Sequence, residues 1–170
     1  MEMLYAPWRN GYSDSTDRTK HEDASSSECV FCSQFLQDND KEHFILRRFD
    51  HVVVLLNRYP YNAGHLLILP TEHKSSIDDL LPEVQSELMW ATGKSSTILK
   101  NILAAQGINI GINMGKIAGA GIPAHLHVHV LPRWNGDTNF LPTLGKIKVI
   151  SYDLEDVYTK LKKPFQLLQR

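Results

Sequence analysis

The chain has 170 residues, a length that fits one domain built around a single hydrophobic core. Its hydrophobic fraction of 42% and charged fraction of 22% are ordinary values for a soluble globular protein. The formal net charge of -1 argues against long nucleic acids as partners, because proteins that bind them usually carry a basic surplus. No apolar run approaches the roughly 18 residues of a membrane span, and the start lacks a signal-peptide pattern. We therefore expect a cytoplasmic protein with no membrane partner.

The first 28 residues differ in character from the rest of the chain. Asn10–Glu28 is polar and follows neither helical nor strand periodicity. We interpret residues 1–28 as an N-terminal arm, whose Tyr5 and Trp8 would dock on the body of the protein or on a second subunit. Residues 29–170 would then form one domain.

The pattern of apolar residues, glycines and prolines predicts the elements that follow the arm. In chain order these are a helical turn at Phe35–Leu36, strands at His43–Arg48, His51–Leu56 and Leu66–Leu69 (stopped by Pro70), a helix from Pro82 to about Gln106 (ended by Gly107), a strand at Ile108–Asn113, a glycine-rich loop at Gly115–Gly121, a strand at Leu126–Leu131 (stopped by Pro132) and a short helix at Leu154–Leu161. The two strands around the long loop Asn57–Gly64 would form a hairpin. Strands, one long helix, more strands and a late helix indicate an α+β fold with an antiparallel sheet.

His125, His127 and His129 are separated by single apolar residues. In a β-strand, residues i, i+2 and i+4 point to one face, so three imidazoles would line that face while Leu126 and Val128 enter the core. Burial for structural reasons alone is costly, because each imidazole needs polar partners and can become charged near about pH 6.5. The pattern therefore indicates a functional cluster.

Two kinds of chemistry fit this cluster. Histidines at i and i+2 can chelate a metal ion. Alternatively, a neutral imidazole can attack phosphorus and form a covalent phosphoramidate, while a neighbouring histidine protonates the leaving group. The glycine-rich loop before the strand favours phosphate, because Gly119 and Gly121 would let backbone N–H groups approach an anion closely.

Cys29 and Cys32 are the chain's two cysteines, and their spacing is typical of metal ligands or of a redox pair. A tetrahedral zinc site needs two further ligands. His73 follows the strand that ends before Pro70, and His125 begins the histidine strand, so both would reach the cysteines if these strands share a sheet. Such a Cys₂His₂ site has no open position and would be structural. The alternative is a free or redox-active thiol pair, although no βαβ unit surrounds it.

The segment His125–Pro132, HLHVHVLP, resembles the motif of the histidine triad (HIT) superfamily. The upstream segment Asn57–Leu66, NRYPYNAGHL, is similar to the corresponding segment of that family. The resemblance extends over roughly Cys29–Phe140, and the stretches Ala6–Arg9 and Pro132–Phe140 resemble a bacterial subgroup similar to diadenosine tetraphosphate phosphorylases and hydrolases. The family fold is a five-stranded antiparallel sheet with a long helix and a C-terminal helix, and family members are usually homodimers that share a ten-stranded sheet.

The resemblance also implies roles for individual residues. His127 would be the nucleophile that attacks the α-phosphate and becomes nucleotidylated, His129 would help the leaving group depart, and His65 would support the nucleophile. Nucleotide contacts would come from Asn57 at the ribose hydroxyls, Leu55 and Leu67 in the walls of the base pocket, and Asn113, His129, Gly119 and Gly121 near the phosphates. A structural zinc ion would be bound by Cys29, Cys32, His73 and His125.

These features predict an enzyme, a nucleotide hydrolase or nucleotidyl transferase that acts on dinucleoside polyphosphates such as diadenosine tetraphosphate through a nucleotidyl-histidine intermediate. Many HIT hydrolases carry a Gly-Gln-Ser/Thr segment before the triad, whereas Gly119–Ala124 contains neither glutamine nor a hydroxyl. The acceptor therefore stays open between water and inorganic phosphate. The alternative is a nucleotide-binding regulatory HIT protein with low phosphoramidase-type activity.

Overall fold

The computed structural model describes residues 25–139, 144–145, 150 and 152–169. In chain order the elements are α2 (Val30–Leu36), β1 (Ile45–Arg48), β2 (Val52–Leu56), β3 (Leu66–Pro70), α3 (Pro82–Leu103), β4 (Gly107–Ile112), β5 (Val128–Arg133) and α5 (Leu154–Gln166). Of the expected N-terminal arm, residues 1–24 lie outside the described part, and with them Tyr5 and Trp8.

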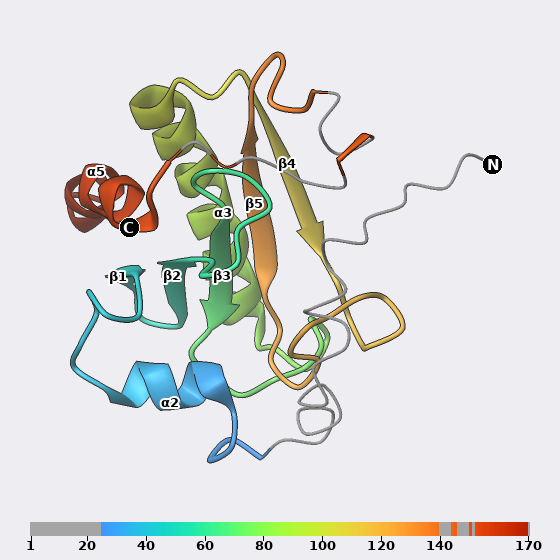
Figure 1. The fold of residues 1–170 in the computed structure, drawn as a ribbon. Helices are drawn as coiled ribbons and strands as arrows, with labels where there is room; N and C mark the ends of the chain where they lie inside the picture. Colours follow the sequence, from blue (N-terminus) through green and yellow to red (C-terminus); the bar gives the residue numbers. More distant parts are fainter. Residues whose placement is uncertain (1–24, 140–143, 146–149, 151, 170) are drawn as a thin grey trace.

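The five strands form one antiparallel sheet in the order β1-β2-β3-β5-β4 (Figure 1). The α+β prediction with a five-stranded antiparallel sheet is therefore confirmed. The expected hairpin is also present, since β2 pairs with β3 from Val52 opposite Pro70 to Leu56 opposite Leu66. Because β3 is followed in the sheet by β5, the strand that carries His129 lies beside the strand that begins after His65.

The main core lies between one face of the sheet and the helices α3 and α5. Alternate residues of the central strands point to this face, as the twofold strand period requires. The core residues from these strands are Val52, Val54, Leu56, Leu66, Ile68, Val128 and Val130. They pack with Val84, Leu88, Ala91 and Leu99 of α3 and with Val157, Leu161 and Phe165 of α5. Figure 1 shows α5 beside α3, at the side of the sheet away from β4.

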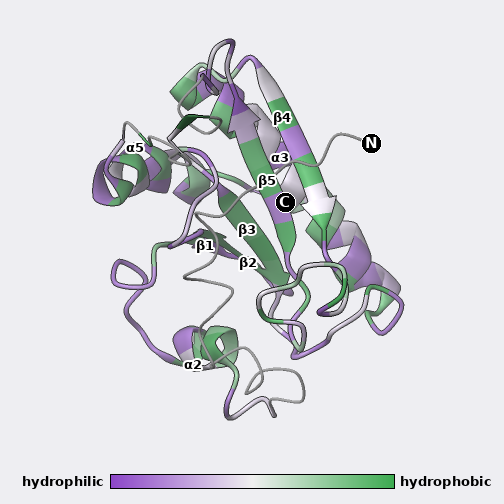
Figure 2. Ribbon diagram, turned by 45° about the vertical axis from the view of Figure 1, so that its right-hand side comes forward, coloured by the Kyte–Doolittle hydropathy of each residue, from purple (hydrophilic) through white to green (hydrophobic). Residues whose placement is uncertain are grey.

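A second apolar cluster lies on the opposite face of the sheet, where the short helix α2 packs. The strand residues of this cluster are Ile45, Val53, Leu55, Leu67 and Leu69, and α2 and its N-cap contribute Phe31 and Cys29. Because β3 is buried on both faces, it is apolar along its whole length (Figure 2). His129 of β5 therefore stands beside an apolar strand.

Arg48 holds the C-terminal end of α2 against the sheet. Its guanidinium donates to the carbonyl oxygens of Phe35 at 2.7 Å and Gln37 at 3.1 Å, and to the carboxylate of Asp40 at 2.8 Å. Lys162 of α5 donates to the same carboxylate at 3.2 Å. A helix of seven residues is not stable by itself in water, so these contacts and its apolar packing hold it in place.

The predicted end of the long helix was wrong. The helix stops at Leu103, and the residue that caps it is Ala104, in the left-handed conformation (φ 52°, ψ 36°), rather than Gly107. The following residues explain this, since the amide of Ala105 donates to Leu99 O and that of Gln106 to Arg133 O. These bonds hold a conformation that alanine alone disfavours. Gly107 instead begins β4.

Pro70 ends β3, as predicted, but Pro132 does not stop β5. Pro132 pairs with Ile108, and the strand continues to Arg133. Proline removes only the N–H donor of a strand residue, and its carbonyl still accepts hydrogen bonds. The carbonyl of Pro132 accepts from Asn62, and that of Pro70 is a partner of His125. The C-terminal helix likewise continues past Leu161 through Pro164, because Phe165 is fully buried in the core.

None of the helices in the described residues combines the length and apolar character that a membrane crossing requires.

Two glycines provide a matched test of the fold. At Gly64 φ is +75°, and a Cβ there would lie 2.6 Å from Leu103 Cδ1, so Gly64→Ala should lower the free energy of unfolding by at least about 1 kcal/mol. At Gly93, within α3, a Cβ meets no atom within 4 Å, so Gly93→Ala should raise it by about 0.5–1 kcal/mol. Denaturant unfolding followed by circular dichroism measures both. Equal effects of the two substitutions would contradict this account.

Candidate active site and metal centre

The three triad histidines occupy the start of β5 and the bend before it. The strand was expected to begin at Leu126 but begins at Val128, so only His129 lies within it. Leu126 and Val128 nevertheless enter the main core, as the alternation predicts. The rings of His127 and His129 lie together, with centroids 5.0 Å apart. The ring of His125 lies beside Cys29 and Cys32, and the Phe31 ring contacts both His125 and His127.

His127 has a defined tautomer. Its Nδ1–H donates to the backbone carbonyl of His125 at 2.8 Å. A neutral imidazole carries one proton, so Nε2 holds a free lone pair. Burial lowers the pKa of His127, and the bond to the carbonyl only partly opposes this. The ring is therefore neutral at physiological pH, the state in which an imidazole is nucleophilic.

His65 lies against His129. Its Nε2 is 2.9 Å from Nδ1 of His129, and the side chain of His65 is fully buried. The backbone N–H of Tyr61 donates to His65 Nδ1 at 3.2 Å. Because Nδ1 of His65 accepts, the proton of neutral His65 is on Nε2 and is donated to His129. Neutral His129 then carries its own proton on Nε2, which makes it a hydrogen-bond donor through that atom.

The side chain of Asn57, the expected ribose contact, belongs to the same network. Its Oδ1 accepts from the backbone N–H of Tyr59 at 2.9 Å, and its Nδ2 lies 3.2 Å from His65 Nδ1. A carboxamide has a second lone pair and a second N–H, so it retains capacity for a ligand. Asn57 therefore stands at the end of β2 in direct contact with the histidine cluster.

Leu55 and Leu67 lie on the same face of the sheet as His129, and Leu67 is the residue directly opposite His129 in the ladder. Both are nearly buried, with 3% and 5% of their surfaces exposed. They belong to one apolar cluster with Phe31, whose ring centroid lies 5.8 Å from that of His127. The structure thus places both leucines beside the histidines, beneath α2.

Asn113 follows β4 and lies beside the glycine-rich loop, since a Cβ on Gly119 would be 3.9 Å from its Nδ2. Gly115 and Gly119 both have positive φ, which the tight loop requires. The amide of Gly119 donates to Lys116 O at 2.9 Å, so its N–H points into the loop rather than toward a ligand. A small hollow is lined by Lys116, Gly119, Ala120, Gly121 and Pro123.

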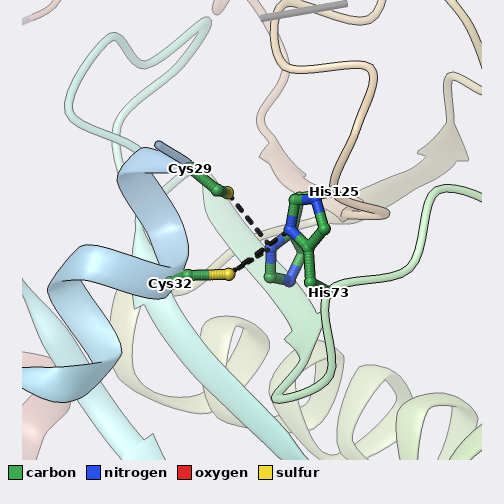
Figure 3. Close-up of side chains that lie close together, drawn as sticks. All are labelled: Cys29, Cys32, His73 and His125. Carbon is green, nitrogen blue, oxygen red and sulfur yellow. Dashed lines mark hydrogen bonds between the residues drawn. The ribbon is translucent and has the colours of Figure 1, made fainter. Parts of the chain in front are cut away.

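The two cysteines, His73 and His125 converge as the sequence predicted (Figure 3). One ligand atom from each lies within 4.8 Å of the others. Nδ1 of His125 is 3.4 Å from Cys29 Sγ and 3.5 Å from Cys32 Sγ, and Nδ1 of His73 is 3.4 Å from Cys32 Sγ. The thiols come from α2 and its N-cap, whereas the imidazoles come from the segments after β3 and before β5.

The electrostatics of this cluster suit a cation. The Nε2–H of His125 donates to Pro70 O at 3.0 Å, which leaves the Nδ1 lone pair facing the thiols. Burial lowers the pKa of His125 to about 4, so the ring is neutral. Burial and the neighbouring Cys29 raise the pKa of Cys32 to about 11. A bound divalent metal would stabilise the thiolate form of the cysteines, and the neutral ring of His125 already presents a lone pair to it.

Two aromatic residues at the site were not assigned a role from the sequence. Phe31 contacts His125 and His127, with ring centroids 5.5 and 5.8 Å away. Tyr61 stacks on His129, with centroids 5.8 Å apart and planes inclined by 17°. Phe31 stands between the two cysteines in the sequence, and Tyr61 stands within the upstream family segment. Neither position predicts a contact with the histidines, because these contacts join segments that are far apart in the chain.

Comparisons with known proteins identify the family of this fold. The family model of the HIT domain matches residues 38–136. A protein of Mycobacterium tuberculosis named AP-4-A phosphorylase is 36% identical over 156 residues, which are 92% of this chain and 80% of that protein. The asymmetrical bis(5'-nucleosyl)-tetraphosphatase of Schizosaccharomyces pombe is 33% identical over 82 residues, 48% of this chain and 44% of that protein.

Among solved structures, a zinc-bound histidine triad family protein from Mycobacterium smegmatis superposes with a TM-score of 0.68 and 26% identity. The match covers 84% of this chain and 96% of that chain. The chain belongs to the HIT family and is an enzyme of that family.

Proposed function

We propose that this enzyme transfers a nucleotidyl group from a dinucleoside polyphosphate to inorganic phosphate through a covalent intermediate on His127. The observation that carries the proposal is the neutral His127 with its Nδ1–H bound to the His125 carbonyl and its Nε2 lone pair free. Attack of Nε2 on the α-phosphorus forms a P–N bond and breaks the bond to the bridging oxygen. With diadenosine tetraphosphate, the leaving group is ATP and the enzyme retains AMP on His127.

His129 supports departure of the leaving group in this scheme. Its Nε2–H, set by the hydrogen bond from His65, is a donor for a phosphate oxygen beside the nucleophile. Phosphate then attacks the nucleotidyl-histidine, so that a new P–O bond replaces the P–N bond and ADP leaves. The 36% identity with a relative named AP-4-A phosphorylase supports phosphate over water as the acceptor.

The nucleotide would lie across the face of the sheet that carries the histidines. Asn57 would bind the ribose through its remaining hydrogen-bond capacity, and the base would lie against the cluster that contains Leu55 and Leu67. Asn113 and the loop with Gly119 and Gly121 would lie along the phosphates. Because the Gly119 N–H is already used within its turn, Gly121 and the side chain of Lys116 are better placed to donate.

His127→Ala should lower turnover of diadenosine tetraphosphate by at least about 10³-fold, because the bond-forming atom is removed. Its circular dichroism spectrum should match that of wild type, and His43→Ala, outside the site, should keep wild-type activity. An active His127→Ala protein would rule the mechanism out. Wild-type protein that binds nucleotide but turns over no faster than His127→Ala would support the regulatory alternative.

The products formed from diadenosine tetraphosphate identify the acceptor of the nucleotidyl group. With inorganic phosphate, wild-type enzyme should yield ADP and ATP, and without it the reaction should stop at nucleotidylated enzyme. AMP and ATP in equal amounts, with or without phosphate, would show hydrolysis instead.

We propose further that Cys29, Cys32, His73 and His125 bind one structural zinc ion. A tetrahedral zinc with Zn–S of about 2.3 Å and Zn–N of about 2.0 Å separates sulfur and nitrogen ligands by about 3.6 Å. The observed separations of 3.4–3.5 Å fit this requirement. When bound, the ion would supply a cross-link and no open position for substrate.

The proposed zinc site also supports a domain that begins at residue 29, because Cys29 is the first of its ligands in the chain.

Elemental analysis tests the zinc site. Wild-type protein should contain about one zinc per chain, and Cys29→Ser should lose it and melt at a lower temperature. Ser33→Ala, an exposed position on the same helix, should keep the metal. Equal zinc in the Cys29→Ser and wild-type proteins would exclude this ligand set.

We also propose a homodimer formed through β4. This strand is at the edge of the sheet, with one side of its backbone unpaired by any described strand. Large apolar side chains are exposed on this strand and just after it: Ile110 at 53% and Met114 at 49%. Pairing with β4 of a second chain would cover them and extend the sheet to ten strands.

Sedimentation velocity tests the dimer. Wild-type protein should sediment as a dimer, whereas Ile110→Glu should sediment as a monomer, because dimerisation would bury the added charge. Leu36→Glu, at an apolar residue on α2 that is 88% exposed, should remain dimeric. The proposal fails if wild type is monomeric or if Ile110→Glu still dimerises.

A further inference from the structure

Tyr61 lies on the loop between β2 and β3 and covers two of the site's histidines. Its ring is 4.7 Å from that of His65 and 5.8 Å from that of His129, with planes inclined by 38° and 17°. The His65 and His129 rings are themselves 5.1 Å apart. The three rings therefore contact one another in a triangle, and the phenol ring lies against both partners of the His65–His129 hydrogen bond.

The backbone of Tyr61 acts on the same pair. Its N–H donates to His65 Nδ1, which fixes the proton of His65 on the nitrogen that faces His129. The hydrogen bond between the two imidazoles needs both rings to stay close to their present planes, because an N–H···N bond weakens steeply as its angle falls. A half-turn of the His129 ring would replace Nδ1 with a carbon and break the bond.

The loop that carries Tyr61 is fixed to β5 through the next residue. Asn62 Nδ2 donates to Pro132 O and to Asp137 Oδ2, each at 3.0 Å. Asp137 is held in turn by Arg133, with contacts of 2.6 and 2.9 Å, and the guanidinium holds its pKa well below the usual range. Pro132 and Arg133 belong to the strand that carries His129, so the position of Tyr61 is set relative to that strand.

We propose that Tyr61 is a positioning residue for His129. The aromatic ring keeps the His65 and His129 imidazoles in the planes that allow their hydrogen bond, and this bond keeps the Nε2–H of His129 directed at the leaving-group oxygen. The role rests on the proposed nucleotidyl transfer. The phenol hydroxyl is not required, since both contacts are made by the ring.

Three variants separate positioning from packing. Tyr61→Phe keeps the ring and should behave as wild type. Tyr61→Leu removes it and should lower kcat by about tenfold with KM within about twofold, because His129 acts in the transition state rather than in binding. Tyr59→Leu, two residues earlier and 69% exposed, is the matched control and should change neither constant.

The direct readout is the nitrogen–nitrogen scalar coupling across the hydrogen bond between His65 Nε2 and His129 Nδ1, measured by NMR in isotope-labelled full-length protein. It should be present in wild type and Tyr61→Phe, and weakened or lost in Tyr61→Leu. Tyr61→Met fills similar space without a ring and replaces the leucine variant if that variant unfolds.

An unchanged coupling in a folded ringless variant overturns the proposal, whatever the activity. An altered coupling with unchanged kcat overturns it as well. If wild type does not act on dinucleoside polyphosphates, the proposed reaction fails, while the coupling still decides whether Tyr61 orders the two histidines.

Discussion

Two hydrogen bonds to backbone carbonyls determine which ring nitrogen of His125 and of His127 carries a lone pair. Pro70 O accepts from Nε2 of His125, and His125 O accepts from Nδ1 of His127. The two rings therefore hold opposite tautomers, although they are only two residues apart. His125 presents the Nδ1 lone pair to the cysteines, and His127 presents the Nε2 lone pair to the site. Without these carbonyls, neither ring would have a fixed tautomer. The proposed roles, metal binding for His125 and catalysis for His127, depend on these tautomers.

The strand pairing explains why the carbonyls are available. Pro70 ends β3 and His125 lies in the bend before β5, so neither carbonyl is used by the ladder where these strands begin to pair. The helix α2 then joins the two centres physically. Cys29 and Cys32 lie beside His125, while Phe31 between them contacts His127. A change at Cys29 or Cys32 thus acts on Phe31, which packs against His127, the proposed nucleophile.

Periodicity and residue chemistry predicted the sheet and the convergence of Cys29 and Cys32 with His73 and His125. These two features follow from local alternation and from donor types, which a sequence shows directly. The apolar residues Leu55 and Leu67 were expected near the histidines only from the family resemblance. The sequence did not reveal that Tyr61 stacks on His129, because the contact depends on how a loop folds back over a neighbouring strand. The sequence also did not predict that the helix ends at Ala104. The left-handed backbone there is held by hydrogen bonds of the following amides, one of them to Arg133 of β5.

The cluster of Cys29, Cys32, His73 and His125 also has a consequence for the order in which the molecule assembles. Cys29 and His125 are 96 positions apart in the chain. During synthesis from the N-terminus, both thiols leave the ribosome long before the last imidazole that faces them. Closing so long a loop carries an entropic cost that only the completed sheet offsets. The cluster therefore forms late, and the short helix beside it reaches its final position only after the histidine strand has been made.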